Sequence, residues 1–161
     1  MDAWSKRIPE IAYLLNPAFC SSIIYHVILG YQKKAKREFP FTLVYLILPI
    51  VLHKSTRERI TSRTNMVVWI QKHPDVLVGF PDRAKSLVSF ANESVEFLLL
   101  QEVLQISNGE LSVAKTLSKS KINAIEDQEI HECYNKAENV GRWFAQMGAE
   151  ENIYAAWGVK P

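Results

Sequence analysis

The stretch that decides the fold is FPFTLVYLILPIVLHKSTRERI, residues 39–60. Its first part, Thr42 to Leu52, is a run of eleven residues with one hydroxyl and one proline. It falls short of the roughly 20 residues that span a bilayer, so it predicts a buried helix. Pro49 must kink that helix or lie near its end, because proline clashes with the preceding turn. The second part, His53 to Arg59, is a charged segment that could form a solvated loop or bind a phosphate or an acidic partner.

The length and composition favour one folded domain with a sizeable core. The chain has 161 residues, of which 48% are hydrophobic and 22% are charged. We expect a single domain over residues 1–161, made of N-terminal helices (1–60), a winged-helix-like part (61–116), and a C-terminal helix with an aromatic tail (124–161). The start MDAWSKRIPE has no apolar signal-peptide region. We expect Cys20 and Cys133 to be core residues of a protein in a reducing compartment. These features favour a cytoplasmic protein.

The charge is unevenly distributed. Residues 1–72 hold 11 Lys/Arg against 4 Asp/Glu, whereas residues 73–161 hold 8 against 13, although the net charge of the whole chain is only +2. A basic front half and an acidic back half suit a protein between unlike neighbours, or two regions that attract each other within one fold.

Local signals predict the order of the remaining elements. Asn16-Pro17 is typical of a helix start, with Asn as the cap and Pro at the first helical position. The middle third then predicts a helix from about Arg63 and a short strand at Val76–Val78. Two further helices should begin at Pro81 and near Asn92, followed by a hairpin over residues 104–113 whose turn is Asn108-Gly109. Helix, strand, helix, helix, hairpin is the order of a winged helix-turn-helix domain. The predicted fold is mainly α with a small β-hairpin, a winged-helix-like domain flanked by N-terminal and C-terminal helices.

The helix in the recognition position argues against reading of DNA bases. The sequence ANESVEFLLLQE carries three glutamates and no Lys or Arg, so it would repel phosphates. Lys115, Lys119 and Lys121 after the hairpin could contact a DNA backbone without specificity. The charges favour a protein-binding winged helix over a DNA-binding one.

The C-terminal third predicts a long helix from about Glu126 to Met147, which Gly148 ends. The tail after it, residues 152–161, is rich in aromatic residues, whereas loose tails are usually polar. We expect it to dock, either onto its own domain or onto a partner.

The sequence offers no pattern for catalysis. Its six glycines form no phosphate-binding loop, and its four histidines lack metal-ligand spacing with the cysteines. No serine stands in a nucleophile elbow. We predict no enzyme activity, no cofactor and no metal.

Three stretches of the chain carry a family resemblance: EIAYLLNPAF (10–19), residues 39–58, and GRWF (141–144) together with IYAAWGVKP (153–161). With these motifs the chain resembles the middle component of bacterial ABC three-component systems, anti-phage modules that include the Lamassu type. Lys160 stands where that family usually has arginine. The resemblance implies a non-catalytic adaptor that joins an SMC-like ABC ATPase to an effector such as a nuclease, and restrains the effector until DNA is sensed.

The candidate partner contacts are the cations of the charged segment and the aromatic residues near the C-terminus: Lys54, Arg57, Arg59, Trp143, Tyr154 and Trp157. The alternative function is a stand-alone winged-helix regulator that binds DNA through its wing and basic front half. We expect no membrane contact.

Overall fold

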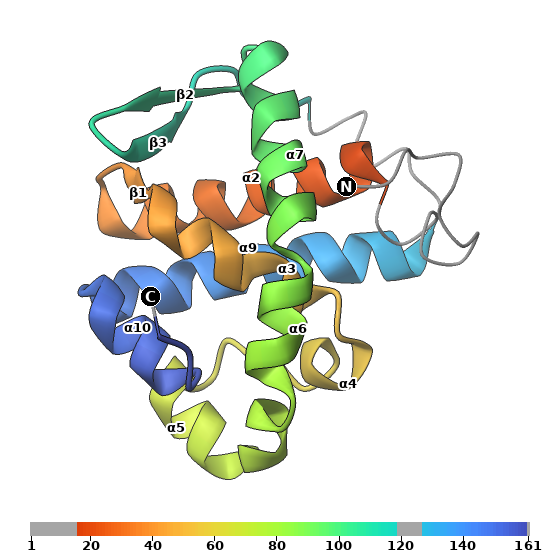
Figure 1. Cartoon of the computed structure of the whole chain (residues 1–161), viewed down its shortest axis with the longest axis vertical. Helices are drawn as coiled ribbons and strands as arrows, with labels where there is room; N and C mark the ends of the chain where they lie inside the picture. Colours follow the sequence, from red (N-terminus) through yellow and green to blue (C-terminus); the bar gives the residue numbers. More distant parts are fainter. Residues whose placement is uncertain (1–15, 119–126, 161) are drawn as a thin grey trace.

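The computed structural model describes residues 16–118 and 127–160, which are mainly helical with a small antiparallel sheet (Figure 1). The elements in order are α2 (Pro17–Ala35), β1 (Phe39–Pro40), the 3-10 helix η2 (Phe41–Leu43), α3 (Val44–Val51), α4 (Lys54–Arg57), α5 (Met66–Lys72), the 3-10 helix η3 (Pro74–Leu77), α6 (Phe80–Ser86), α7 (Val88–Leu100), β2 (Leu104–Ser107), β3 (Glu110–Val113), α9 (Gln128–Met147) and α10 (Glu150–Ala156). Among the described residues, no helix combines the length and apolar character needed to cross a bilayer.

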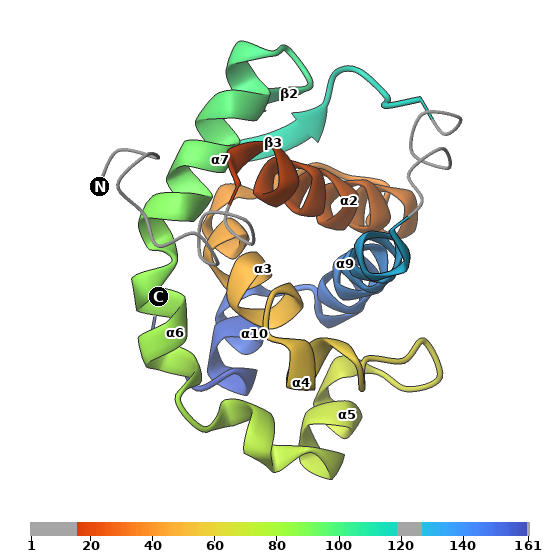
Figure 2. The same cartoon turned by 90° about the vertical axis from the view of Figure 1, so that its right-hand side faces the viewer.

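Helices α2 and α9 pack side by side at the centre of the fold, with α3 against them, while α6 and α7 follow one another along one side (Figure 2). Two glycines allow the close contact of α2 with α9. A Cβ atom on Gly30 would clash with the carbonyl oxygen of Glu138, and one on Gly141 would clash with that of Val27. Only glycine lets these backbones approach so closely.

The predicted start of α2 is confirmed. The side chain of Asn16 accepts hydrogen bonds from the backbone N–H groups of Ala18 and Phe19, and Pro17 is the first helical residue. The helix ends at Ala35, and the residue that caps it, Lys36, takes a left-handed conformation with φ 58°. These local signals therefore place the first central helix correctly.

The apolar run within residues 39–60 forms a buried helix, as predicted. Every residue of α3 except Tyr45 is buried, and the helix ends at Val51, two residues after Pro49. The residues before it form β1 and η2, and the charged segment after it contains the single-turn helix α4. One stretch of sequence thus supplies an edge of the sheet and a central helix of the core.

The hairpin is also confirmed. Strands β2 and β3 pair antiparallel with Ser107 opposite Glu110, and the turn residues Asn108 and Gly109 have φ of 53° and 75°. Positive φ at both positions is what the Asn-Gly dipeptide favours. The sheet has a third strand that the sequence did not reveal, because β1 pairs with β3 in the order β1-β3-β2.

The predicted strand at Val76–Val78 is wrong. Pro74–Leu77 is the 3-10 helix η3, in which the N–H of Val76 bonds to the carbonyl of His73 and that of Val78 bonds to Asp75. Pro74 starts this turn because its ring fixes φ near the helical value. Val76 is buried whereas Val78 is exposed, so three apolar residues in a row do not make a strand here.

The other predicted helices exist with shifted ends. Asn65 caps α5, α6 begins at Phe80 rather than at Pro81, and α7 begins at Val88 rather than near Asn92. Asp127 caps α9, which ends at Met147 before Gly148 with φ 79°.

Candidate partner interface

The aromatic tail docks onto its own domain. Residues 150–156 form α10, and the following Trp157 is fully buried. Its ring stacks on Phe80 with centroids 4.8 Å apart, and its indole N–H donates to the Met66 sulfur at 3.2 Å. The tail is therefore part of the core in this conformation.

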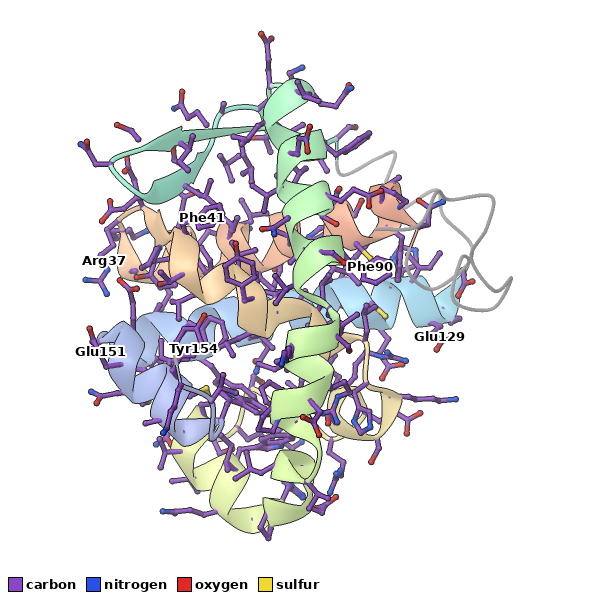
Figure 3. All side chains as sticks on the ribbon, in the orientation of Figure 1. Arg37, Phe41, Phe90, Glu129, Glu151 and Tyr154 are labelled. Carbon is purple, nitrogen blue, oxygen red and sulfur yellow. The ribbon has the colours of Figure 1, made fainter. Side chains whose placement is uncertain are left out.

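Trp143 and Tyr154 are buried in the same way. The indole N–H of Trp143 donates to the carbonyl of Thr64 at 2.9 Å, and its ring lies 5.1 Å from that of Trp69. Tyr154 points from α10 toward the segment before α3 and donates its hydroxyl to the carbonyl of Thr42 (Figure 3). Burial raises the pKa of Tyr154 to about 12. Each polar atom thus has a partner within the chain, as buried polar groups require.

The charged segment divides into a buried and an exposed half. Arg57 is only 3% exposed, donating to the carbonyl of Val51 at 3.0 Å and to the Glu129 carboxylate at 2.9 Å. Val51 is the last residue of α3, so Arg57 satisfies a carbonyl that the helix end leaves open and ties it to the start of α9. This arginine is a structural link between helices.

The other two candidate cations lie nearer the surface. Arg59 donates to both carboxylate oxygens of Asp75, at 3.0 and 2.7 Å, and holds the pKa of that carboxyl below its usual value. Lys54 is exposed, and its ammonium lies 3.8 Å from Glu58. Burial and the arginines Arg83, Arg59 and Arg57 lower the pKa of His53. All three cations of the segment therefore face a carboxylate of their own chain.

An acidic face with large apolar side chains lies at the end of α7 and on the hairpin. Phe97, Leu100 and Ile106 are 39%, 73% and 48% exposed. The 26 residues from Val88 to Val113 contain four glutamates and no Lys, Arg or His: Glu93, Glu96, Glu102 and Glu110. We call this surface the acidic face. Exposed apolar groups gathered beside charges of one sign are typical of protein-binding surfaces.

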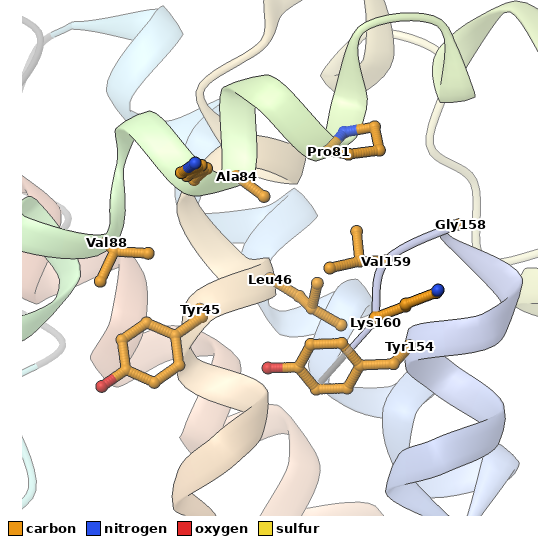
Figure 4. Close-up of a pocket in the computed structure, with 10 residues that line it drawn as sticks. Tyr45, Leu46, Pro81, Ala84, Val88, Tyr154, Gly158, Val159 and Lys160 are labelled. Atoms are coloured by element: carbon orange, nitrogen blue, oxygen red, sulfur yellow. The ribbon is translucent and has the colours of Figure 1, made fainter.

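A groove of about 580 Å³ lies between α6, α3 and the C-terminal tail (Figure 4). Leu46, Ala84 and Tyr154 form its buried floor, and Tyr45 and Val159 are half-buried walls. The exposed residues of its rim are Pro81, Lys85, Val88, Gly158 and Lys160. This volume falls within the range of ligand-binding clefts.

Residues 16–118 and 127–160 contain no cluster of three or more His, Cys, Asp or Glu that could hold a metal ion. Burial raises the pKa of the Cys133 thiol to about 11, which keeps it protonated and unreactive at neutral pH.

A family model described as "ABC-three component (ABC-3C) system Middle Component 3" matches residues 4–161. This chain belongs to that family. The comparison with curated proteins found no match, and neither did the comparison with solved structures.

In this middle component, most of the residues that the sequence predicts as partner contacts are not on the surface. Arg57, Trp143, Tyr154 and Trp157 are buried, so a partner of the folded chain would meet only Lys54 and the outer part of Arg59 among the six candidates. Lys115 is exposed, while Lys119 and Lys121 lie outside the described residues. The acidity of α7 was visible in the sequence, but the exposure of Phe97, Leu100 and Ile106 and the groove were not.

Proposed function

We propose that this middle component is a non-catalytic adaptor of a bacterial anti-phage complex of the Lamassu type, acting in the cytoplasm. It joins an SMC-like ABC ATPase to an effector such as a nuclease, and it restrains the effector until DNA is sensed. The observation that carries this proposal is the family match over residues 4–161, because the family is one component of a multi-component ABC system.

A winged-helix arrangement is part of the proposal, with elements other than those the sequence suggested. The order α2, β1, α3, α7 and the hairpin β2–β3 is helix, strand, helix, helix, hairpin, with β1 pairing to β3. Helices α4, α5 and α6 would then be an insertion between the second and third helices of the motif. This assignment places α7 in the recognition position.

The charge of α7 supports protein binding rather than DNA binding at that position. Glutamates in a stretch of sequence without Lys, Arg or His repel phosphates, while the exposed Phe97 and Leu100 suit an apolar partner surface. An adaptor also needs two surfaces, and α7 runs from one to the other. Val88 at its start lines the groove, and Leu100 at its end, about 18 Å away along a 13-residue helix, belongs to the acidic face.

Copurification tests the adaptor proposal. The tagged chain, coexpressed with the ATPase and effector components of its system, should retain both on an affinity resin. The double variant Phe97→Gln/Leu100→Gln should fold like the wild-type chain. On the resin it should retain only one of the two components. Val78→Gln is the matched control, because Val78 is 77% exposed but stands between η3 and α6 rather than on α7 or the hairpin, and this variant should retain both components. A wild-type chain that retains neither component would refute the adaptor.

A DNA-binding assay tests the alternative of a stand-alone regulator. The isolated chain should not bind duplex DNA even at about 50 mM salt, where phosphate neutralisation is strongest. Salt-dependent binding by the chain alone would favour the regulator instead.

A further inference from the structure

The groove is formed by a regular stripe of side chains on one wall and by three separate segments on the other. Pro81, Ala84, Lys85 and Val88 have the spacing i, i+3, i+4 and i+7, so they share one helical face across the junction of α6 and α7. Tyr45 and Tyr154 face them from α3 and α10, with Val159 and Lys160 of the tail alongside (Figure 4). The stripe is about 10 Å long, which is two helical turns.

The lining of the groove is apolar except for two cations. Of the described residues that line it, only Lys85 and Lys160 are charged, and they come from different walls. Both tyrosine hydroxyls are already used, since Tyr45 bonds to the Asn92 side chain at 2.7 Å and Tyr154 donates to the carbonyl of Thr42. An occupant would therefore meet aromatic rings and aliphatic groups, with two ammonium groups at the rim.

Among the described residues, neither Lys85 nor Lys160 forms an ion pair. Asp82 precedes Lys85 by three residues on α6 but does not line the groove, and the carboxylate of Glu150 accepts a hydrogen bond from Thr42. No Asp or Glu lines the groove within residues 16–118 and 127–160. The groove thus has the opposite charge from the acidic face at the far end of α7.

We propose that the groove binds a short acidic, apolar segment of another protein component, with apolar side chains on the floor and Asp or Glu carboxylates at Lys85 and Lys160. This inference rests on the proposed adaptor function, because it takes the partner to be another component of the system. Opposite charges at the two surfaces assign them to different components, since each surface disfavours the segment that suits the other.

Charge reversal at the rim tests the inference in the coexpressed complex. Lys85→Glu/Lys160→Glu should lower the retention of one component about tenfold or more and leave the other bound, because two carboxylates would then face two carboxylates. The matched control is Lys34→Glu/Lys72→Glu. Both lysines are exposed and occupy the last turns of α2 and α5, as Lys85 does in α6. The control should retain both components.

A second pair of variants tests the apolar part without touching the lysines. Val88 and Val67 are 37% and 36% exposed, and each lies in the first turn of its helix, where an aspartate is tolerated. Val88→Asp should weaken the same component that the lysine reversal releases, and Val67→Asp should not.

Three results would overturn the inference while the wild-type complex still forms. They are full retention by the groove variants, equal loss in the control pairs, or release of the wild-type component by nuclease treatment, which would mean that the lysines bind nucleic acid. A wild-type chain that captures no component at all contradicts the adaptor proposal itself, so the two failures are distinguishable.

Discussion

The interior beneath the tail and the acidic face of α7 use large side chains in opposite ways. The ring of Trp69 lies 5.1 Å from that of Trp143 and 6.3 Å from that of Trp157, and all three side chains are at most 2% exposed. Leu100, at the end of α7, is 73% exposed. The tryptophans that stand out in the sequence therefore stabilise the chain, whereas an ordinary leucine is available to a partner.

The cations differ in the same way. Arg57 is buried and links α3 to α9, while Lys85 on the rim of the groove is exposed. Residue type alone does not separate a structural cation from a binding one, because both roles use the same charge. The following substitutions test whether the interior and the surface are as distinct as the structure has them.

Trp157→Ala should have the largest effect. Removing a fully buried indole leaves a cavity beside Phe80 and should lower the free energy of unfolding by about 3–5 kcal/mol, measured by urea denaturation. Lys160→Ala, an exposed position in the same tail, should change it by less than about 0.5 kcal/mol. An unchanged unfolding midpoint with loss of the complex would instead make Trp157 a partner contact.

Gly141→Ala should have the next largest effect on stability. The added methyl group meets the Val27 carbonyl, so α2 and α9 must separate, and the free energy of unfolding should fall by about 1–3 kcal/mol. Asn135→Ala is the control, since Asn135 is exposed on the same helix and alanine favours helix there. Equal thermal midpoints for the two variants would show that the helices do not approach this closely.

Arg57→Met and Arg59→Met compare the two halves of the charged segment. Loss of the Arg57 guanidinium leaves the buried Val51 carbonyl without this donor and should lower the free energy of unfolding by about 1–3 kcal/mol. Arg59→Met should cost less, because its pair with Asp75 is near the surface and screened by water. If urea denaturation gives the same loss for both, Arg57 is not the buried link described here.

Glu138→Gln should lower the thermal midpoint at pH 6 and have progressively less effect as the pH falls. The imidazole of His26, 3.5 Å away, holds the pKa of Glu138 below its ordinary 4.5, so the ionised carboxylate stabilises the fold. That stability is fully present above pH 4.5 and is lost as the pH falls through the lowered pKa. Thermal midpoints measured from pH 6 downward should fall less steeply in the variant; parallel curves would exclude this contribution.

Leu100→Gln should have the smallest effect on stability, within about 0.5 kcal/mol, because the side chain is mostly in water already. Together with Trp157→Ala it defines the two ends of the comparison. A large loss of stability in Leu100→Gln would mean that this face is packed in the native fold.

Local signals in the sequence determined several elements correctly. Each of these features depends on the backbone preferences of a few adjacent residues. They are the cap at Asn16-Pro17, the helix end near Pro49, the Asn108-Gly109 turn and the end of α9 at Gly148. The acidity of α7 could likewise be read directly, as could the absence of a bilayer-length apolar run from residues 39–60.

Only the tertiary structure decided which other elements each of these helices and strands contacts. The pairing of β1 with β3 joins Phe39 to Leu111, the Arg57 guanidinium reaches Glu129, and Trp157 reaches Met66. These contacts depend on which helix faces come together across long stretches of chain, and the sequence periodicity of one element does not contain that information. Burial is a property of the assembled fold, which is why the sequence predicts Trp143 and Trp157 as partner contacts and does not predict the exposure of Leu100.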